Sequence, residues 1–275
     1  MQTARAWKIA LPIVALTCAS ALGSSVRGDE PRKLEPVSKP VGAVSKDATS
    51  TAVAAVAPPP HAANGAPHAL HAARVPQPIS IDAKMEHKRV WDSDSGGTGV
   101  FRDPRGDGMV PYSEARVRWD QDHLYLWLYA GDLDLQARTR KRDGDLRGDD
   151  AFHVEIAGPD SRYVIEVSLL GTVYDAACPR ALAPSDPLPR RACQANWQSK
   201  AQVAVDRDGS LNRIHDNDEE WLVELSLPLA SVGLANAAGG SRIPFSVRRC
   251  EVGFDGRHAC GGWGLDGGSE LVLDP

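Results

Sequence analysis

The class of the fold follows from residues 115–129, which read Ala115-Arg-Val-Arg-Trp-Asp-Gln-Asp-His-Leu-Tyr-Leu-Trp-Leu-Tyr129. Apolar and charged side chains alternate over residues 115–119, and leucine alternates with His, Tyr or Trp over residues 123–129. Successive side chains of a strand point to opposite faces, so each run predicts a strand with one buried face. Asp120-Gln-Asp122 between them is typical of a turn, and the whole segment therefore predicts a β-hairpin.

The same pattern of short strands continues toward the end of the chain. A second hairpin is predicted for residues 151–156 and 162–168, which Gly158-Pro159-Asp160 joins. Further strands are predicted at three segments, 200–206, 221–227 and 243–254. Helical periodicity is nearly absent, and Pro228–Gly233 alone predicts a short helical turn. Regular strands with frequent turns predict an all-β fold, an antiparallel β-sandwich over residues 77–275.

The start of the chain has the layout of a secretory signal. In residues 1–27, Arg5 and Lys8 precede the apolar run Ile9–Cys18, and small residues follow. The apolar run is too short to span a bilayer as a helix. Cys18 is a poor match to a lipoprotein site, and a lipid anchor there stays open as an alternative.

Residues 28–76 are expected to be a disordered linker. They are dense in Ala, Pro, Ser and Val and have no aromatic residue, so they bury too little apolar surface to offset the entropy of ordering. The histidines of this segment, His61, His68 and His71, are expected to have no metal-binding role. The compositional break near residue 76 also predicts that the fragment Ile79–Pro275 folds alone.

Charge and hydropathy exclude two classes of partner. The net charge is −5 and no basic run follows the signal, so no nucleic acid partner is expected. No later stretch approaches ~18 apolar residues, so no membrane span is expected. The predicted protein is exported, to the periplasm, the cell surface or the exterior.

Four cysteines follow the signal segment: Cys178, Cys193, Cys250 and Cys260. An even number in an exported chain favours disulfides, and the pairings nearest in sequence are Cys178–Cys193 and Cys250–Cys260. Each bond would close a short loop and stabilise the fold by about 2–4 kcal/mol in the chain-entropy account. Free thiols or a metal site are the alternatives, although the spacings match no zinc pattern.

The order of the segments resembles the family 9 carbohydrate-binding modules and their wider group. Six pieces carry the resemblance: Ile79-Ser-Ile-Asp82 with the later Trp91, the hairpin Ala115–Tyr129, Arg142–Asp150, Tyr163–Asp175, Trp221–Gly233, and Trp263 with Leu271–Leu273. No piece is specific alone, but the six occur in the family's order. The resemblance implies a β-sandwich that binds poly- or oligosaccharides and is commonly attached to glycoside hydrolases.

The resemblance also implies a ligand site. Sugar-binding members of the family sandwich a terminal sugar between two tryptophans, and Trp263 stands at the second of these positions. Arg147 stands at the first, while His153 and Glu166 replace an acidic residue and an arginine. These departures leave the expected fold unchanged, but they weaken the expectation that the chain binds sugar. Trp263 lies in Gly261-Gly-Trp-Gly264, where it either forms an open platform or folds against the sandwich edge.

An acidic segment is a candidate calcium site. Asp143, Asp149 and Asp150 lie close in sequence, and calcium needs six to eight oxygen ligands. Relatives in the family bind structural calcium, so the resemblance implies the same cofactor here. The alternative is a solvated acidic loop, since the EF-hand pattern does not occur.

No signature of catalysis occurs in the sequence. G-x-S-x-G, H-E-x-x-H and P-loop patterns do not occur, and nothing pairs two carboxylates as a glycosidase requires. A non-catalytic carbohydrate-binding module, associated with polysaccharide breakdown, is therefore expected. Two alternatives stay open: a structural or adhesive envelope protein, and a b-type haem sandwich with axial ligands among Met85, Met109, His153 and Lys200.

Overall fold

The computed structural model describes residues 68–84, 89–92, 96–103, 111–181, 190–213 and 216–275. The chain divides into two compact units, residues 1–59 and 60–275, and the first lies wholly outside the described residues. The elements of the second unit are β1 (Ala69–Arg74), η2 (Arg89–Trp91), β2 (Ser113–Trp119), β3 (His123–Gly131), β4 (Ala151–Ala157), β5 (Ser161–Ser168), β6 (Val173–Pro179), η3 (Arg190–Ala192), β7 (Gln202–Asp208), β8 (Glu220–Pro228), η4 (Leu229–Val232), β9 (Arg242–Val252), β10 (His258–Trp263) and β11 (Glu270–Leu273).

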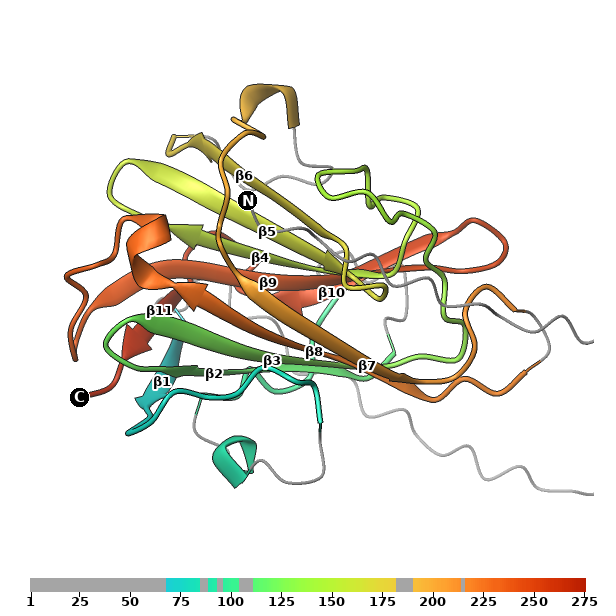
Figure 1. The fold of residues 1–275 in the computed structure, drawn as a ribbon, viewed down its shortest axis with the longest axis horizontal. Coiled ribbons are helices and arrows are strands. Elements are labelled where there is room, and N and C mark those ends of the chain that lie inside the picture. The colour runs from blue at the N-terminus through green and yellow to red at the C-terminus, as the bar shows by residue number, and fades with distance from the viewer. Residues whose placement is uncertain (1–67, 85–88, 93–95, 104–110, 182–189, 214–215) are drawn as a thin grey trace, which may run out of the picture. The chain divides into compact units, whose positions relative to one another are not determined.

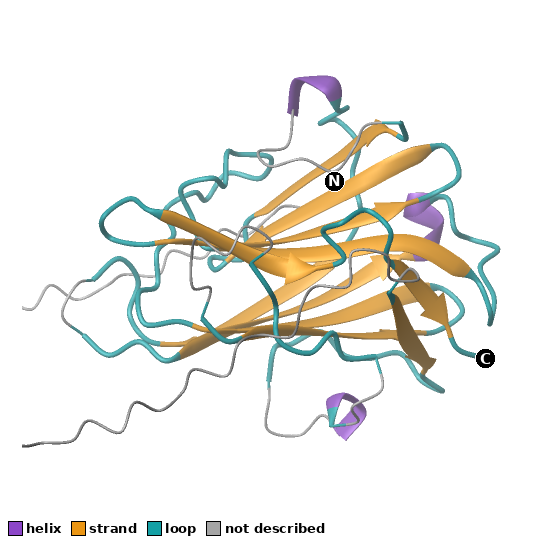
Figure 2. Cartoon of the chain, turned by 180° about the vertical axis from the view of Figure 1, so that it is seen from behind, coloured by secondary structure: helices purple, strands orange, loops and turns teal. Residues whose placement is uncertain are grey.

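The strands form one continuous sheet that curls into two layers. Its order is β6-β5-β4-β9-β11-β1-β2-β3-β8-β7, and β10 pairs with β9. In Figure 1 the strands β6, β5, β4, β9 and β10 make a first layer, and β2, β3, β8 and β7 make a second layer facing it. Figure 2 shows the same layers from behind. The predicted all-β sandwich is confirmed, with one difference: β1 pairs in parallel with both β11 and β2.

Strand β1 lies in the segment that the sequence analysis assigned to the linker. Leu70 and Ala72 are 4% and 0% exposed, and their neighbours point outward, as in an ordinary half-buried strand. His71 places its Nδ1 2.8 Å from Oδ1 of Asp274. Residues 69–74 therefore belong to the folded domain, and the predicted linker boundary at residue 76 is wrong for them. Composition could not show this, because the strands that this Ala-rich segment pairs with lie far away in the sequence. His61 lies outside the described residues.

The two predicted hairpins are confirmed. Trp119 pairs with Leu124 across the first turn, where Oδ1 of Asp120 accepts the backbone N–H groups of Asp122 and His123 at 2.8 Å. Ala157 pairs with Arg162 across the second turn. The predicted strands at 200–206, 221–227 and 243–254 are β7, β8 and β9, and the predicted helical turn is η4.

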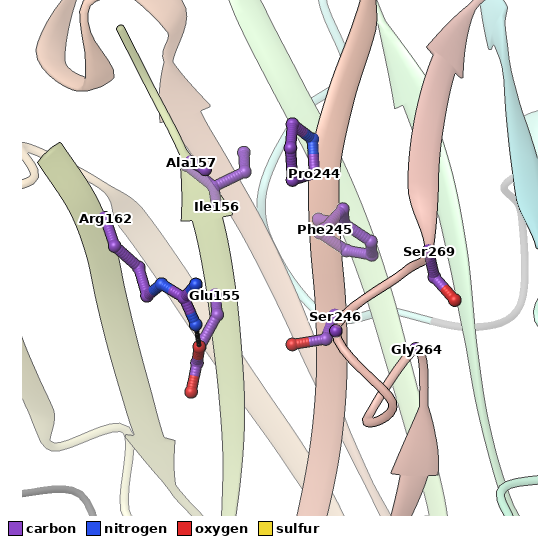
Figure 3. Close-up of a pocket in the computed structure, with 10 residues that line it drawn as sticks. Glu155, Ile156, Ala157, Arg162, Pro244, Phe245, Ser246, Gly264 and Ser269 are labelled. Atoms are coloured by element: carbon purple, nitrogen blue, oxygen red, sulfur yellow. Dashed lines mark hydrogen bonds and ion pairs between the residues drawn. The ribbon is translucent and has the colours of Figure 1, made fainter. Parts of the chain in front are cut away.

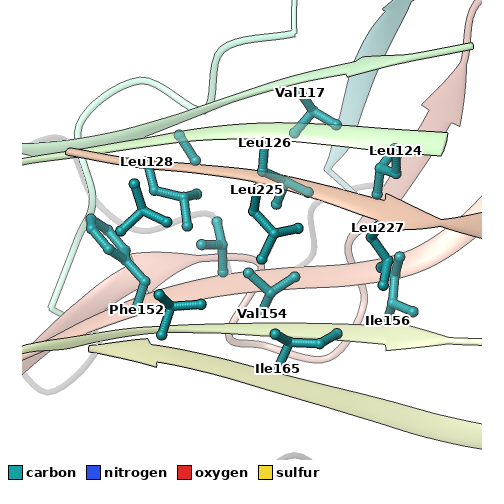
Figure 4. Close-up of a cluster of buried hydrophobic side chains, with 14 of the residues drawn as sticks. Val117, Leu124, Leu126, Leu128, Phe152, Val154, Ile156, Ile165, Leu225 and Leu227 are labelled. Carbon is teal, nitrogen blue, oxygen red and sulfur yellow. The ribbon is translucent and has the colours of Figure 1, made fainter. Parts of the chain in front are cut away.

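The core lies between the two layers. Leu124, Leu126 and Leu128 of β3 are fully buried against β4 side chains that include Phe152 and Val154 (Figure 4). Full burial of a leucine contributes about 1.5–3 kcal/mol. The alternation of β3 therefore puts its leucines inside and its aromatic residues on the outer face of the second layer.

Both expected disulfides are present. Cys178 is bonded to Cys193, and Cys250 is bonded to Cys260. Cys250 and Cys260 are opposed residues of β9 and β10, so this bond fixes the register of those two strands. The first bond ties the end of β6 to the segment that follows η3.

One arginine crosses the sandwich. Arg249 on β9 occupies a position of the strand alternation that faces the core, and its charged side chain is 0% exposed. It donates to Oδ2 of Asp132 at 2.7 Å, to the carbonyl oxygen of Gly131 at 2.8 Å and to Oγ of Ser113 at 3.0 Å. These partners belong to β2, β3 and the loop after β3, so Arg249 joins the two layers.

Two carboxyl groups near Arg249, the half-buried Glu251 and the buried Asp150, have pKa values raised above their usual range. Burial raises the pKa of Glu251 to about 7, and the charges of Asp132 and Asp134 add to the shift. Burial likewise raises the pKa of Asp150 to about 8, with a further contribution from Asp132. Both groups keep their protons in the folded state at pH values where the unfolded chain has lost them.

Stability is therefore expected to fall as the pH rises from about 5 to about 8. The raised pKa values mean that the folded state binds more protons than the unfolded state, whose carboxyl pKa values are about 4. Glu251→Gln removes one of these groups. Its stability relative to the parent should grow by about 1–2 kcal/mol between pH 5 and pH 8, measured by urea denaturation. An advantage that does not change with pH would contradict the assignment.

Candidate ligand-binding site

The predicted residues His153 and Glu166 lie side by side on the outer face of the first layer. They belong to a line of paired residues that crosses five strands, which we call the polar row: Tyr174, Glu166, His153, Arg248 and Gly262. Directly paired residues point to the same face of a sheet. Phe152 and Val154, the sequence neighbours of His153, are buried in the core, so the polar row faces outward.

Glu166 is the electrostatic centre of the polar row. Its side chain is 1% exposed, accepts a hydrogen bond from Nη2 of Arg190 and lies 3.3 Å from Nδ1 of His153. Burial alone would raise the pKa of this carboxyl group. The charges of His153, Arg190 and Arg248 outweigh burial and hold the pKa of Glu166 below its usual value. The carboxylate is therefore ionised and fixed in place.

Further charged side chains lie over the end of the polar row that Tyr174 and Glu166 form. The guanidinium of Arg190 stacks on the ring of Tyr174, 3.7 Å from its centre, and also lies 3.8 Å from Asp145. Nε of Arg147 donates to Oδ1 of Asp145 at 2.9 Å, and this contact lowers the pKa of Asp145 to about 2. The side chain of Arg147 is 63% exposed, so the network ends at the surface.

The structure thus connects three of the four predicted ligand residues. Arg147, His153 and Glu166 are linked through two residues that the sequence did not predict as part of a ligand site, Asp145 and Arg190. Charges of opposite sign alternate from Arg147 through Asp145 and Arg190 to Glu166. Each group is therefore held by its neighbours before any ligand arrives.

Two anchors hold the loops above the polar row. Leu146, between Asp145 and Arg147, is 1% exposed and packs with Ala151, Tyr174 and Ala176 in a small second core. The disulfide between Cys178 and Cys193 holds the segment that carries Arg190. A buried leucine and a covalent bond thus place charges that the sequence puts in irregular loops.

Trp263 does not join the polar row. It pairs with Val247, whose side chain lies in the core, so Trp263 is on the inner face of β10. It is partly buried and packs against Phe245, with ring centres 6.2 Å apart. Gly262 takes the outward position instead, and a Cβ there would come within 2.3 Å of the carbonyl oxygen of Val247. The structure therefore favours the edge-packed alternative for Trp263.

A small depression adjoins the polar row (Figure 3). Its walls include Glu155 and Ser246, which lie two residues from His153 on β4 and two residues from Arg248 on β9. Nη1 of Arg162 donates to Oε2 of Glu155 at 3.1 Å. The depression holds about 30 Å³, which leaves room for water or a hydroxyl group but not for a sugar ring.

The three aspartates expected to bind calcium do not fit that ion. Both carboxylate oxygens of Asp149 accept backbone N–H groups from residues 138–139, and those of Asp150 accept two more, at 2.6 and 2.7 Å. Asp143 is exposed. Across the described ranges, no group of three or more His, Cys, Asp or Glu side chains could hold a metal ion. Asp149 and Asp150 instead fix the loop that carries Arg147.

The haem ligands considered from the sequence are not assembled in the described part of the chain. Met85 and Met109 lie outside the described residues. His153 contacts Glu166 in the first layer, whereas Lys200 is exposed just before β7 of the second layer.

The part of the chain that the structure describes contains no helix with the length and hydropathy of a membrane-spanning segment.

Comparison with solved structures supports the architecture. The chain is similar to a candidate carbohydrate-binding protein from Bacteroides uniformis, with a TM-score of 0.56 and 11% identity over 75% of this chain and 99% of that chain. The likeness is one of fold. The chain is also similar to a family 9 carbohydrate-binding module from Caldicellulosiruptor kristjanssonii, solved with cellotriose and with glucose, at a TM-score of 0.48 and 12% identity in each case. These matches cover 75% of this chain and 93% and 95% of the solved chains. No family model and no curated protein matches the chain.

Proposed function

We propose that this chain is a non-catalytic carbohydrate-binding domain whose ligand face is the polar row with the loops above it. The observation that carries the proposal is the fixed carboxylate of Glu166, which Arg190 and His153 hold and which Arg190 and Asp145 connect to the exposed guanidinium of Arg147. The likeness of fold to the candidate carbohydrate-binding protein from Bacteroides uniformis supports it.

The chemistry of the face suits sugar hydroxyl groups. A hydroxyl group donates one hydrogen bond and accepts others, so it needs both carboxylates and N–H groups. Asp145 and Glu155 offer carboxylate oxygens, and Arg147 offers the planar donors of its guanidinium. Because salt bridges already hold these groups, binding immobilises few side chains and loses little entropy.

Export and a role in polysaccharide breakdown belong to the same proposal. The two disulfides favour an oxidising compartment, such as the periplasm, the cell surface or the exterior. In such a compartment, a binding domain without catalysis would keep its protein close to a polysaccharide that other enzymes cleave.

Native gels containing soluble polysaccharides test the proposal. The full chain should migrate more slowly in gels that contain at least one of hydroxyethyl cellulose, xylan, mannan or polygalacturonate, and it should release no new reducing ends from any of them. Unchanged migration in every gel would favour the structural or adhesive alternative. Release of reducing ends would show an enzyme.

Arg147→Gln is expected to weaken retardation about 5- to 10-fold in apparent Kd, since a charged hydrogen bond contributes about 1.5–3 kcal/mol and part of this is regained from water. The melting temperature should stay the same, because the side chain is 63% exposed. Arg140→Gln, at an exposed position of the same loop, is the matched control and should bind like the parent. Equal binding by both variants would remove Arg147 from the site.

A further inference from the structure

Three aromatic residues line up on the outer face of the second layer, which we call the aromatic ladder: Tyr112, Tyr129 and Trp127. Trp127 and Tyr129 are two residues apart on β3, and their rings stack with centres 5.5 Å apart and planes 10° apart. The ring of Tyr112 meets that of Tyr129 edge-on, with centres 5.8 Å apart. The core takes Leu126 and Leu128 from the same strand, so the ladder is not part of the interior.

The ladder is rigid at one end and open at the other. Trp127 packs against the small cluster that contains Trp91 and Tyr125, which holds its ring in place. Tyr112 at the other end is 50% exposed. Single exposed aromatic residues are common on protein surfaces, but a fixed row of three that ends in an open ring is typical of a contact surface.

Polar groups suited to hydroxyls flank the rings. Glu114 pairs with Tyr129 across β2 and β3, and Glu220 accepts a hydrogen bond from the Tyr129 hydroxyl. Arg116 lies over the Trp127 ring, 5.1 Å from its centre, and its Nη2 is 3.0 Å from Oε1 of Glu114. The two carboxylates disfavour an acidic ligand at the ladder, because like charges repel.

We propose that the aromatic ladder is a second carbohydrate-contact surface, which takes a neutral glycan chain. This inference rests on the proposed carbohydrate-binding function and adds a second face to it. The C–H faces of sugar rings pack on aromatic side chains, while carboxylates and a guanidinium bond the hydroxyl groups. The polar row offers no such ring, because its one aromatic residue, Tyr174, is 2% exposed, whereas Tyr112 of the ladder is 50% exposed.

The two surfaces lie on opposite outer faces of the sandwich, since β3 belongs to the second layer and β4 and β5 belong to the first (Figure 1). One polysaccharide strand cannot lie flat on both. Two strands of a network could engage the domain together, and the apparent affinity for a polysaccharide would then exceed that of either face alone.

The test uses the full chain in native gels that contain hydroxyethyl cellulose, xylan or polygalacturonate. Tyr112→Ala should weaken retardation by the neutral polysaccharides about 5- to 10-fold and leave the melting temperature unchanged. Tyr112→Leu should weaken retardation as well, because leucine keeps the apolar volume but lacks the flat ring. Tyr112→Phe should bind like the parent. Phe254→Ala, at another exposed aromatic position, is the control and should have no effect.

The outcomes separate this inference from the proposed function. If Tyr112→Ala migrates like the parent while Arg147→Gln still weakens binding, the ladder is not a contact surface and the proposed function stands. If no polysaccharide retards the parent, both fail. If the effects of Tyr112→Ala and Arg147→Gln combine in the double variant, the two faces bind independently and the inference is supported.

Discussion

Arg249→Met is expected to lower the free energy of unfolding by about 3–5 kcal/mol, because breaking a buried ion pair leaves an uncompensated charge. Asp132 is 1% exposed, and its buried carboxyl group would lose the guanidinium that now lies 2.7 Å away. The carbonyl oxygen of Gly131 and the hydroxyl group of Ser113 would lose a donor in the same place. The tie between β9 and the second layer would be lost.

Urea denaturation of the parent and of three variants measures this loss. Arg242→Met, at a 52% exposed position of the same strand, is the matched control and should change stability by less than about 0.5 kcal/mol. The double variant Arg249→Met with Asp132→Asn should recover part of the loss, since it removes the stranded charge. A loss below about 1 kcal/mol for Arg249→Met would show that the pair is not buried as described.

Removal of β1 is expected to have an effect of similar size. A chain that starts at His68 should melt cooperatively, whereas the fragment Ile79–Pro275 should lose at least about 4 kcal/mol, from the burial of Leu70 and from hydrogen bonds along β11 and β2. Domains of this kind are stable by about 5–15 kcal/mol, so the shorter fragment would be marginal.

Circular dichroism melts of the two fragments compare them directly. Leu70→Asp in the longer fragment should reproduce most of the loss, and Ala69→Asp, at the adjacent exposed position, should not. Cooperative melting of Ile79–Pro275 at the same temperature as the longer fragment would show that β1 contributes nothing to the fold, as the composition of the sequence alone had predicted.

The sequence predicts the hairpins because their pattern is local. Alternation and turn residues place β2 with β3 and β4 with β5, and counting back from the second turn pairs His153 with Glu166. The same alternation in β9 puts Arg248 outward, a position that the sequence analysis did not use. It also assigns Arg249 to the core, and a charged residue at such a position is the one sequence signal of the buried ion pair.

The remaining features depend on contacts between segments far apart in the chain. Strand β1 has one large apolar side chain, that of Leu70, and becomes recognisable only beside β11 and β2. Arg190 comes from an irregular segment that a disulfide holds over the polar row, and no periodicity marks it. Trp263 matches the family pattern in sequence, but the register of β10 on β9 turns it inward. The glycines on either side of Trp263 are compatible with an inward or an outward side chain, so the sequence could not decide between the two.

Isothermal titration calorimetry of the full chain measures whether this sandwich binds carbohydrate through the polar row and the loops above it. The ligands are cello-, xylo- and galacturonate oligosaccharides, and Arg147→Gln and Arg140→Gln are titrated in parallel. We expect saturable heat with at least one oligosaccharide, with affinity about 5- to 10-fold weaker in Arg147→Gln and unchanged in Arg140→Gln. No saturable heat with any of them, or equal affinity in the parent and Arg147→Gln, would contradict it.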